Sequence, residues 1–363
     1  MYYRLPTALY CEKNCVINHA DKICSYGKKA YIITGKNSSK KNNSLSNVTS
    51  ALKSHGVALL VYDNISENPS IENIMDAVKK ADKDVDFVIG IGGGSALDAA
   101  KAVSLMLASE NKDRSLFYDK NSPTVYLPVV MIPTTCGTGS EVTPYSILTI
   151  HDKRTKASLP HRIYPELALI DPAYLMTAPA HILKNTAVDA LGHLVESYIN
   201  TKRTDISAMF CEKGLLNWCD IYKMLIENNM TYESYEKLMM VSAYAGMAIS
   251  HTGTSLPHGL SYSITYEHDV PHGKAVGTFV AAYASHADDA DKKFILDKTG
   301  FASVEELSSA IKDLIGDITL TSYEIETAVK NMLLNEAKLA SCPYKVDENI
   351  LNDMYAKSVI RHP

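Results

Sequence analysis

One segment constrains the fold of this chain more than any other: an apolar run that leads directly into glycines and then into a helical pattern. The run Asp86–Ser95 reads DFVIGIGGGS, and the alanine-rich stretch Ala96–Ala108 follows without a break. Glycines let a ligand approach the backbone closely, and a helix N-terminus offers free N–H groups to a phosphate. The segment therefore predicts a buried strand, a phosphate-binding turn and a helix. A tight turn before a well-capped helix, without a ligand, is the alternative.

The start of this helix carries a second pattern. Ser95 and Asp98 have the S-x-x-D spacing of a capping box, so we expect their side chains to cap the helix. Capping alone would explain Asp98 without any ligand.

A second polar loop follows another apolar run. The residues Pro133–Thr143 read PTTCGTGSEVT and follow the run Leu127–Ile132. In open parallel sheets, ligands bind at the carboxyl ends of the strands. Two such loops after neighbouring strands indicate a dinucleotide site more strongly than one glycine run does.

Strand and helix patterns alternate in the first half of the chain and give way to helices in the second. Apolar strand runs occur at Ala30–Thr34, Val57–Tyr62, Phe87–Ile91, Leu127–Ile132 and Leu167–Ile170, with helical stretches such as Ile71–Ala81 and Ala96–Ala108. Beyond residue 179 we expect no strand, and helical periodicity covers Lys184–Asn200, Asp205–Glu227, Tyr232–His251, Val304–Ile315 and Tyr323–Ala340. The 363 residues therefore predict an α/β Rossmann-like parallel-sheet domain (1–178) followed by an all-helical domain (179–363).

Composition excludes several classes of partner. The net charge of −5 gives no basis for nucleic-acid binding or for an anionic membrane surface. We find no signal-peptide pattern and no apolar run of about 18 residues, so no membrane span is expected. Seven scattered cysteines do not form a disulfide framework, and we expect reduced thiols in the cytoplasm.

Four residues are candidates for a metal site. Asp189 and His193 are four residues apart, so both project from one face of a helix. His258 and His272 each lie between a proline and a glycine. One carboxylate and three imidazoles suit a divalent first-row metal, and both Fe²⁺ and Zn²⁺ fit this set. Spacing alone leaves ordinary structural roles for all four residues equally open.

The turn after the first strand bears on the choice of cofactor. NAD-selective sites commonly place an acidic residue there, but this chain has Gly35, followed by Ser38, Ser39 and two lysines. We therefore expect NADP(H) rather than NAD, with the hydroxyls and lysines holding a 2′-phosphate. The alternative is a solvated turn that happens to carry lysines.

Taken together, these segments resemble the iron-containing alcohol dehydrogenase family. The matching stretches are Phe87–Ser104, Pro133–Thr149, Leu167–Pro172, Ala187–Tyr198 and Ala245–Val276. The resemblance implies a dehydroquinate synthase-like fold and a metal held by Asp189, His193, His258 and His272. It also implies a cofactor site formed by Gly92, Gly93, Gly94, Ser95, Asp98, Thr134, Thr135, Thr138 and Lys156.

The implied function is hydride transfer between NADP(H) and a small primary alcohol, aldehyde or diol, with the metal acting as a Lewis acid on the substrate oxygen. We expect a cytoplasmic homodimer with Fe²⁺ or, alternatively, Zn²⁺. One departure concerns proton transfer, because many relatives carry a histidine where this chain has Tyr262. Tyr262, His268 or neither would relay the proton.

Several alternatives remain open from the sequence. The nearest are an NAD-dependent polyol (glycerol-like) dehydrogenase and a dehydroquinate-synthase-like lyase, although the lyase would need more Arg and Lys near the ligands than Lys274. A metal hydrolase is a more distant alternative, because it has no use for two dinucleotide-type loops. A non-catalytic NADP-binding regulator is also more distant, because it has no use for an intact set of metal ligands.

Overall fold

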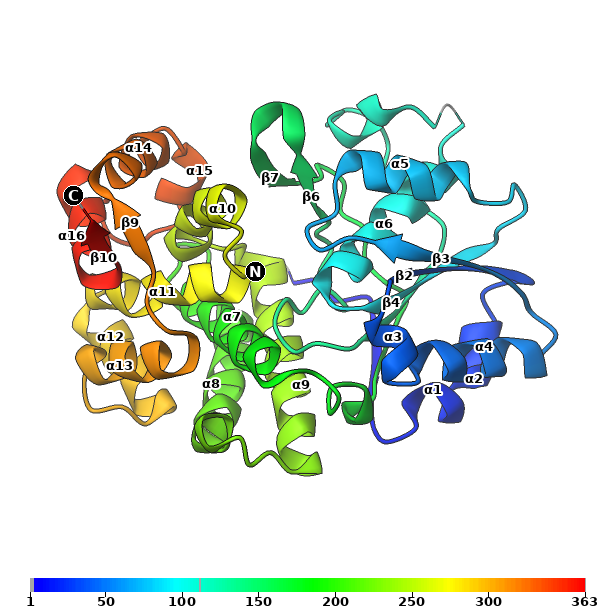
Figure 1. The fold of residues 1–363 in the computed structure, drawn as a ribbon, viewed down its shortest axis with the longest axis horizontal. Coiled ribbons are helices and arrows are strands. Elements are labelled where there is room, and N and C mark those ends of the chain that lie inside the picture. The colour runs from blue at the N-terminus through cyan, green and yellow to red at the C-terminus, as the bar shows by residue number, and fades with distance from the viewer. Residues whose placement is uncertain (1–2, 111, 363) are drawn as a thin grey trace. The chain divides into compact units, whose positions relative to one another are not determined.

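The computed structural model describes residues 3–110 and 112–362, which form two compact units (Figure 1). One unit covers Leu5–Ala178, and the other covers the residues from Pro179 onward together with those before Leu5. No helix in the described part of the chain is long and apolar enough to cross a membrane.

The first unit is built on a six-stranded parallel sheet with the strand order β1-β8-β5-β4-β2-β3. Its strands are β1 (Ala8–Cys11), β2 (Lys29–Gly35), β3 (Ala58–Ile65), β4 (Phe87–Gly92), β5 (Val129–Pro133) and β8 (Leu167–Ile170). The five predicted strands are confirmed. Only β1 escaped the sequence pattern, because it is a four-residue edge strand without a buried residue, paired with β8.

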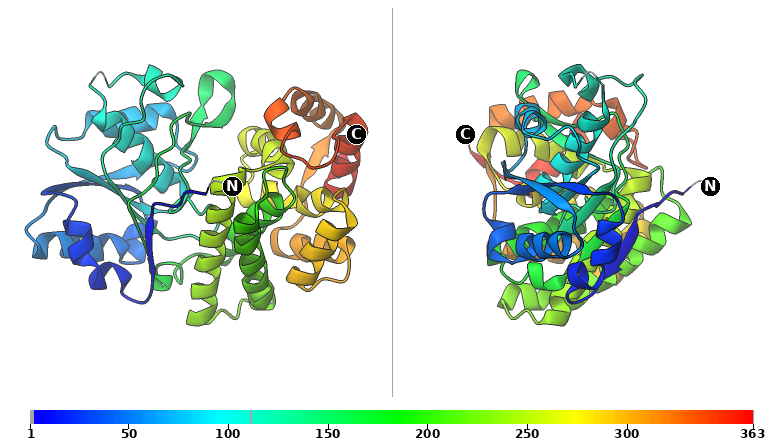
Figure 2. Two further views of the ribbon diagram at one scale, coloured as in Figure 1. Left: turned by 180° about the vertical axis from the view of Figure 1, so that it is seen from behind. Right: turned by 90° about the vertical axis from the view of Figure 1, so that its right-hand side faces the viewer.

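Helices cover both faces of this sheet (Figures 1 and 2). On one face, α5 (Ile71–Lys79) and α6 (Gly94–Ala108) share a core with Tyr31 and Ile33. On the other face, α1 (Cys15–Asn18), α2 (Ala20–Cys24) and α4 (Ser44–Ser54) share a core with Ala30 and Ile32. Successive residues of β2 thus enter opposite cores, which explains why the strand runs are apolar without alternation.

A small hairpin was not predicted. The antiparallel strands β6 (Ile147–Ile150) and β7 (Thr155–Ser158) are joined by a short turn in which Arg154 adopts a left-handed conformation, with φ of 48°. Both strands are short, so neither gives a strong periodic signal. This hairpin carries Lys156, one of the expected cofactor residues.

The second unit is helical, as predicted. Its helices are α7 (Ala180–Tyr198), α8 (Asp205–Glu227), α9 (Tyr232–Thr252), α10 (Leu256–His268), α11 (His272–Ser285), α12 (Asp289–Thr299), α13 (Val304–Ile315), α14 (Ser322–Leu333), α15 (Glu336–Leu339) and α16 (Glu348–Ser358). The expectation of no strand beyond residue 179 is wrong in detail, because β9 (Thr319–Thr321) and β10 (Ile360–His362) form a short parallel pair. The expected helix Tyr323–Ala340 is divided in two, since Asn335 caps a new helix, α15.

Candidate active site

Helix α7 supplies the first two candidate ligands. Asp189 and His193 are both buried, with relative exposures of 3% and 5%. Helix α11 begins close against α7 because Gly273 has no side chain: an added Cβ would clash with the backbone of Asn185. The glycine after His272 is therefore needed to bring the start of α11 onto α7.

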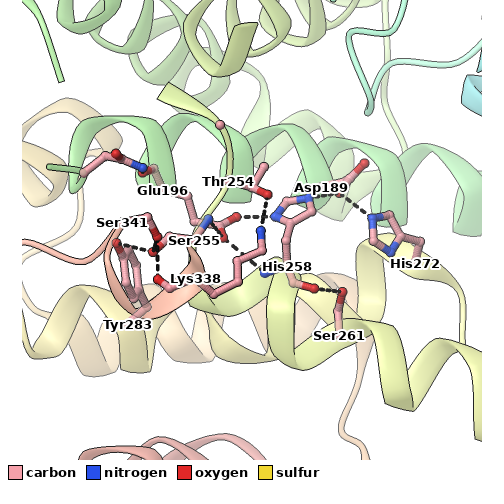
Figure 3. Close-up of polar contacts among 12 residues, drawn as sticks. Asp189, Glu196, Thr254, Ser255, His258, Ser261, His272, Tyr283, Lys338 and Ser341 are labelled. Carbon is pink, nitrogen blue, oxygen red and sulfur yellow. Dashed lines mark hydrogen bonds and ion pairs between the residues drawn. The ribbon is translucent and has the colours of Figure 1, made fainter. Parts of the chain in front are cut away.

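The structure brings three of the four candidate ligands together (Figure 3). The Oδ1 atom of Asp189 lies 3.5 Å from Nε2 of His258 and 3.9 Å from Nε2 of His272. One ligand atom from each residue lies within 4.8 Å of the other two. Asp189 and His258 are buried, whereas the side chain of His272 is 28% exposed. The group is therefore accessible from the His272 side.

His193 lies beside this group. Its ring stacks on the ring of His258, with centroids 4.3 Å apart and an interplanar angle of 26°. It is not part of the close group formed by the other three side chains.

The three grouped residues fit a divalent cation. Oδ1 of Asp189 and Nε2 of His258 are buried, and neither has a hydrogen-bond partner. A buried polar atom without a partner costs about 1–3 kcal/mol, so two that point at each other need an explanation. A cation that accepts carboxylate and imidazole ligands satisfies both atoms.

Glu196 also belongs to this site, although it was not predicted from the sequence. It is completely buried on α7, seven residues after Asp189 and hence on nearly the same face. Its Oε1 accepts hydrogen bonds from the backbone N–H groups of Ser255, at 2.8 Å, and of His258, at 3.1 Å, while its Oε2 contacts Nδ1 of His258. A glutamate within the apolar pattern of a buried helix face was the available signal.

The carboxylates and imidazoles of this group stabilise one another's charged forms, and their pKa values shift accordingly. Burial by itself would lower the pKa of His258, but the carboxylates of Glu196 and Asp189 outweigh it and raise the pKa to about 9. Burial opposes ionisation of Asp189, yet the neighbouring imidazoles hold its pKa well below the usual range. The pocket therefore stabilises negative charge on its carboxylates and positive charge between them.

The two candidate proton relays have different surroundings. The ring of Tyr262 lies nearly parallel to the ring of His272, with centroids 6.2 Å apart. His268 instead pairs with Glu324 at the start of α14, with 3.1 Å between Nε2 and Oε1. Of the two, Tyr262 is the one beside a candidate ligand.

The glycine loop has the predicted strand–turn–helix form. Gly92 ends β4 with φ of 148°, Gly93 caps α6, and Gly94 is its first residue. A Cβ on Gly93 would lie 3.0 Å from Oγ1 of Thr135, and a Cβ on Gly94 would lie 2.5 Å from Cγ2 of Thr138. The two polar loops are therefore in contact, and the absence of side chains on these glycines is what allows it.

The predicted capping box is wrong. Gly93, not Ser95, is the N-cap residue of α6, and no side chain caps it. Ser95 lies inside the helix and accepts a hydrogen bond from the backbone N–H of Asn68. Asp98 is buried and accepts hydrogen bonds from the Ser140 hydroxyl and the Ile147 N–H, so it anchors the second polar loop instead.

Two further expected cofactor residues lie by these loops. Thr134 is buried and its Oγ1 has no hydrogen-bond partner, which leaves a donor for a ligand. Lys156 donates from Nζ to Oδ1 of Asn68 at 2.7 Å. Because Asn68 also binds Ser95, this contact connects the hairpin to the start of α6. Asn68 was not predicted from the sequence as part of this site.

The turn after β2, which is expected to select the cofactor, has both exposed and buried side chains. Gly35 ends β2, and Ser38 is exposed at the start of α3 (Ser38–Lys41). Ser39 is completely buried, and its hydroxyl accepts a hydrogen bond from Thr34. Lys40 pairs with Asp63 at 2.5 Å.

Comparison with known proteins gives a consistent result. Residues 6–172 match the family described as iron-containing alcohol dehydrogenase, and residues 184–338 match the C-terminal domain of that family. A solved iron-containing alcohol dehydrogenase from Thermotoga maritima is 31% identical, covers 99% of both chains and has a TM-score of 0.91. The 1-propanol dehydrogenase PduQ of Citrobacter freundii is 30% identical over 59% of this chain, which spans only 55% of that relative. The sulfoacetaldehyde reductase of Bilophila wadsworthia is 28% identical over 87% of this chain and 84% of its own.

Proposed function

Because the chain belongs to the iron-containing alcohol dehydrogenase family, we propose that it interconverts small primary alcohols or diols and aldehydes with NADP(H) and Fe²⁺. The observation that carries this proposal is the convergence of Asp189, His258 and His272, two of which present buried atoms without hydrogen-bond partners. Metal-dependent oxidoreductases of this kind need such a centre next to a substrate oxygen.

We assign His193 as the fourth ligand. Two observations support this: its ring stacks on the ring of His258, and its charge is among those that lower the pKa of Asp189. A bound divalent cation supplies Lewis acidity toward the substrate oxygen. Glu196 orients the His258 ring, Asp189 offers the anionic ligand, and the partly exposed side chain of His272 marks the side from which the substrate would approach.

The unit Leu5–Ala178 is assigned to the cofactor and the helical unit to the metal and substrate. Gly92, Gly93 and Gly94 expose backbone N–H groups to the cofactor phosphates, and Ser95 and Asp98 hold the loops around them. Thr134, Thr135, Thr138 and Lys156 border the same loops.

NADP(H) is preferred over NAD(H) on the basis of the turn after β2. Gly35 puts no carboxylate at the strand end, and Ser38, Lys40 and Lys41 lie within the next six residues. The contact of Lys40 with Asp63 reduces the positive charge available, so Ser38 and Lys41 are assigned the larger share of 2′-phosphate binding.

We propose small substrates because both relatives are named for small molecules. One is named for 1-propanol, a neutral alcohol, and the other for sulfoacetaldehyde, a sulfonated aldehyde. We also propose a cytoplasmic homodimer. Seven scattered cysteines suit a reducing compartment better than a disulfide framework, and homodimers are the commonest soluble oligomers.

The test is anaerobic turnover of NADPH and NADH with short aldehydes, using chelated protein with and without added Fe²⁺ or Zn²⁺. We expect metal-dependent oxidation that favours NADPH, and a Ser38→Ala, Lys41→Ala variant should lose that preference while NADH turnover persists. Absence of turnover with every metal, in folded protein that binds NADP, would contradict the proposed function.

A further inference from the structure

Lys338 places an ammonium group next to the helix that carries His258. It lies on the short helix α15, and its Nζ donates to Oγ1 of Thr254 at 2.6 Å (Figure 3). Its aliphatic stem packs on Gly259, where an added Cβ would lie 3.3 Å from Cγ of Lys338. A side chain at residue 259 would meet Cε of Met332 first, at 2.7 Å, and would also crowd the stem of Lys338.

This ammonium has no carboxylate partner. Among the described residues, no carboxylate oxygen lies within 4.0 Å of Nζ, and the Thr254 hydroxyl is its hydrogen-bond partner. Glu196 is the acid with the largest effect on its pKa, and the two oxygens of Glu196 already bind Ser255 and His258. Burial lowers the pKa of Lys338 to about 8, and the charge of Glu196 opposes this shift. A charge held in this way is poorly compensated by the protein.

The ammonium lies near Tyr262, a residue beside the candidate metal centre. Nζ is 6.0 Å from the centroid of the Tyr262 ring, and that ring faces the ring of His272, with centroids 6.2 Å apart. His272 is the exposed member of the ligand group. Tyr262 thus has the ammonium of Lys338 and the ring of His272 as neighbours.

The backbone of Lys338 is held in place. Its carbonyl accepts a hydrogen bond from Oγ of Ser341 at 2.6 Å, and the same oxygen of Ser341 contacts Oγ of Ser255 at 2.8 Å. Ser255 and Ser341 are both buried, and Ser255 is the N-cap residue of α10. An anchored backbone reduces the entropy lost when the ammonium binds a ligand.

The balance of charge favours an anion. With a divalent cation bound and the histidines neutral, the cation and Lys338 contribute three positive charges, against one negative charge each from Asp189 and Glu196. One positive charge is left over. A neutral substrate leaves it uncompensated, whereas a substrate with one anionic group cancels it.

We propose that Lys338, with Thr254, binds an anionic group at the far end of the substrate, and that the preferred substrates are short aldehydes and alcohols bearing a carboxylate or sulfonate. This inference rests on the proposed function, and it narrows the substrate class. Lys338 acts here in specificity and takes no part in the hydride transfer.

The test compares substrates of matched length. Wild-type protein should show a kcat/KM for succinate semialdehyde about 10- to 100-fold above that for butanal, the range expected for a hydrogen bond to a charged group. In Lys338→Met this ratio should fall at least about tenfold, mainly through KM, whereas Lys338→Arg should keep most of it. Lys330→Met, on the exposed surface of α14, is the matched control and should leave the ratio unchanged.

A binding measurement separates this inference from the proposed function. Butyrate carries the anionic end without a reacting oxygen, and calorimetric titration should detect its binding to metal-loaded wild-type protein but not to Lys338→Met. Equal kcat/KM for the two aldehydes, or a ratio unchanged in Lys338→Met, would overturn the anion subsite and leave the dehydrogenase intact. If no aldehyde is turned over, the proposed function fails. Butyrate titration then decides by itself whether Lys338 binds anions. Equal butyrate affinity in wild-type protein and Lys338→Met would overturn the anion subsite.

Discussion

The carboxylate of Glu196 contacts His258 at two points, the backbone N–H and the ring Nδ1. The first contact satisfies a free donor at the start of α10, where no side chain of α10's own N-cap residue does so. The second holds a proton on Nδ1 and leaves Nε2, which points toward Asp189, free to bind a cation. One buried side chain therefore determines both the start of a helix and the chemical form of a ligand.

Replacing Glu196 with Gln should weaken metal binding by about 10- to 100-fold, because partners that orient a ligating histidine contribute on that scale. The measurement is competition with a chelator for Co²⁺ or Zn²⁺. The exposed Glu233, replaced in the same way, is the control. An unchanged metal affinity, with only a lower melting temperature, would mean that Glu196 merely caps α10.

Replacing Asp189 with Asn should remove most of the bound metal and nearly all activity while the fold persists. The substitution keeps the shape of the side chain but loses the anionic ligand, and α7 is held by apolar packing on both sides of it. Metal content and the circular dichroism spectrum are measured together. His193→Ala should also weaken metal binding, and full metal occupancy in either variant would refute that residue's assignment.

Replacing Gly94 with Ala should weaken NADP binding about tenfold or more, because the new Cβ would lie 2.5 Å from Cγ2 of Thr138 and force the two loops apart. Dissociation constants from fluorescence titration with NADPH report the effect. Metal affinity of the same variant serves as the control, since the glycine loop and the metal group are in different units. Unaltered NADPH affinity would show that the loops do not enclose the cofactor.

Glu141 predicts a pH dependence of stability. Burial raises the pKa of this carboxyl to about 7, above its ordinary value of 4.5. Below pH 4.5 the Glu141 carboxyl is neutral in both the folded and the unfolded chain. Burying it then lowers the free energy of unfolding least. As the pH rises from 4.5 to 7, the unfolded state ionises first and the free energy of unfolding should fall, by on the order of 3 kcal/mol.

The Glu141→Gln variant should remove this decline, because an amide does not ionise. Urea unfolding at several pH values between 4.5 and 7 measures both proteins. Parallel pH profiles would show that Glu141 is not the group responsible. The neighbouring Lys101, whose pKa burial lowers to about 8, titrates above this window.

The local features of the chain could be predicted from the sequence alone. The five central strands, the glycine turn at 92–94 and most long helices follow from apolar runs, glycine chemistry and helical periodicity, which act over a few residues. The spacing of Asp189 and His193 likewise places both on one helix face, because helix geometry alone decides it.

Pairings between distant residues were decided only by tertiary structure. The capping box expected from Ser95 and Asp98 was lost because Asp98 has better partners in Ser140 and Ile147, more than 40 residues away. Glu196 and Lys338 read as ordinary charged residues in the sequence, and their roles arise from packing α7, α10 and α15 together. Local propensity is set by neighbours along the chain, whereas the cost of burying a charge depends on which partners the fold supplies.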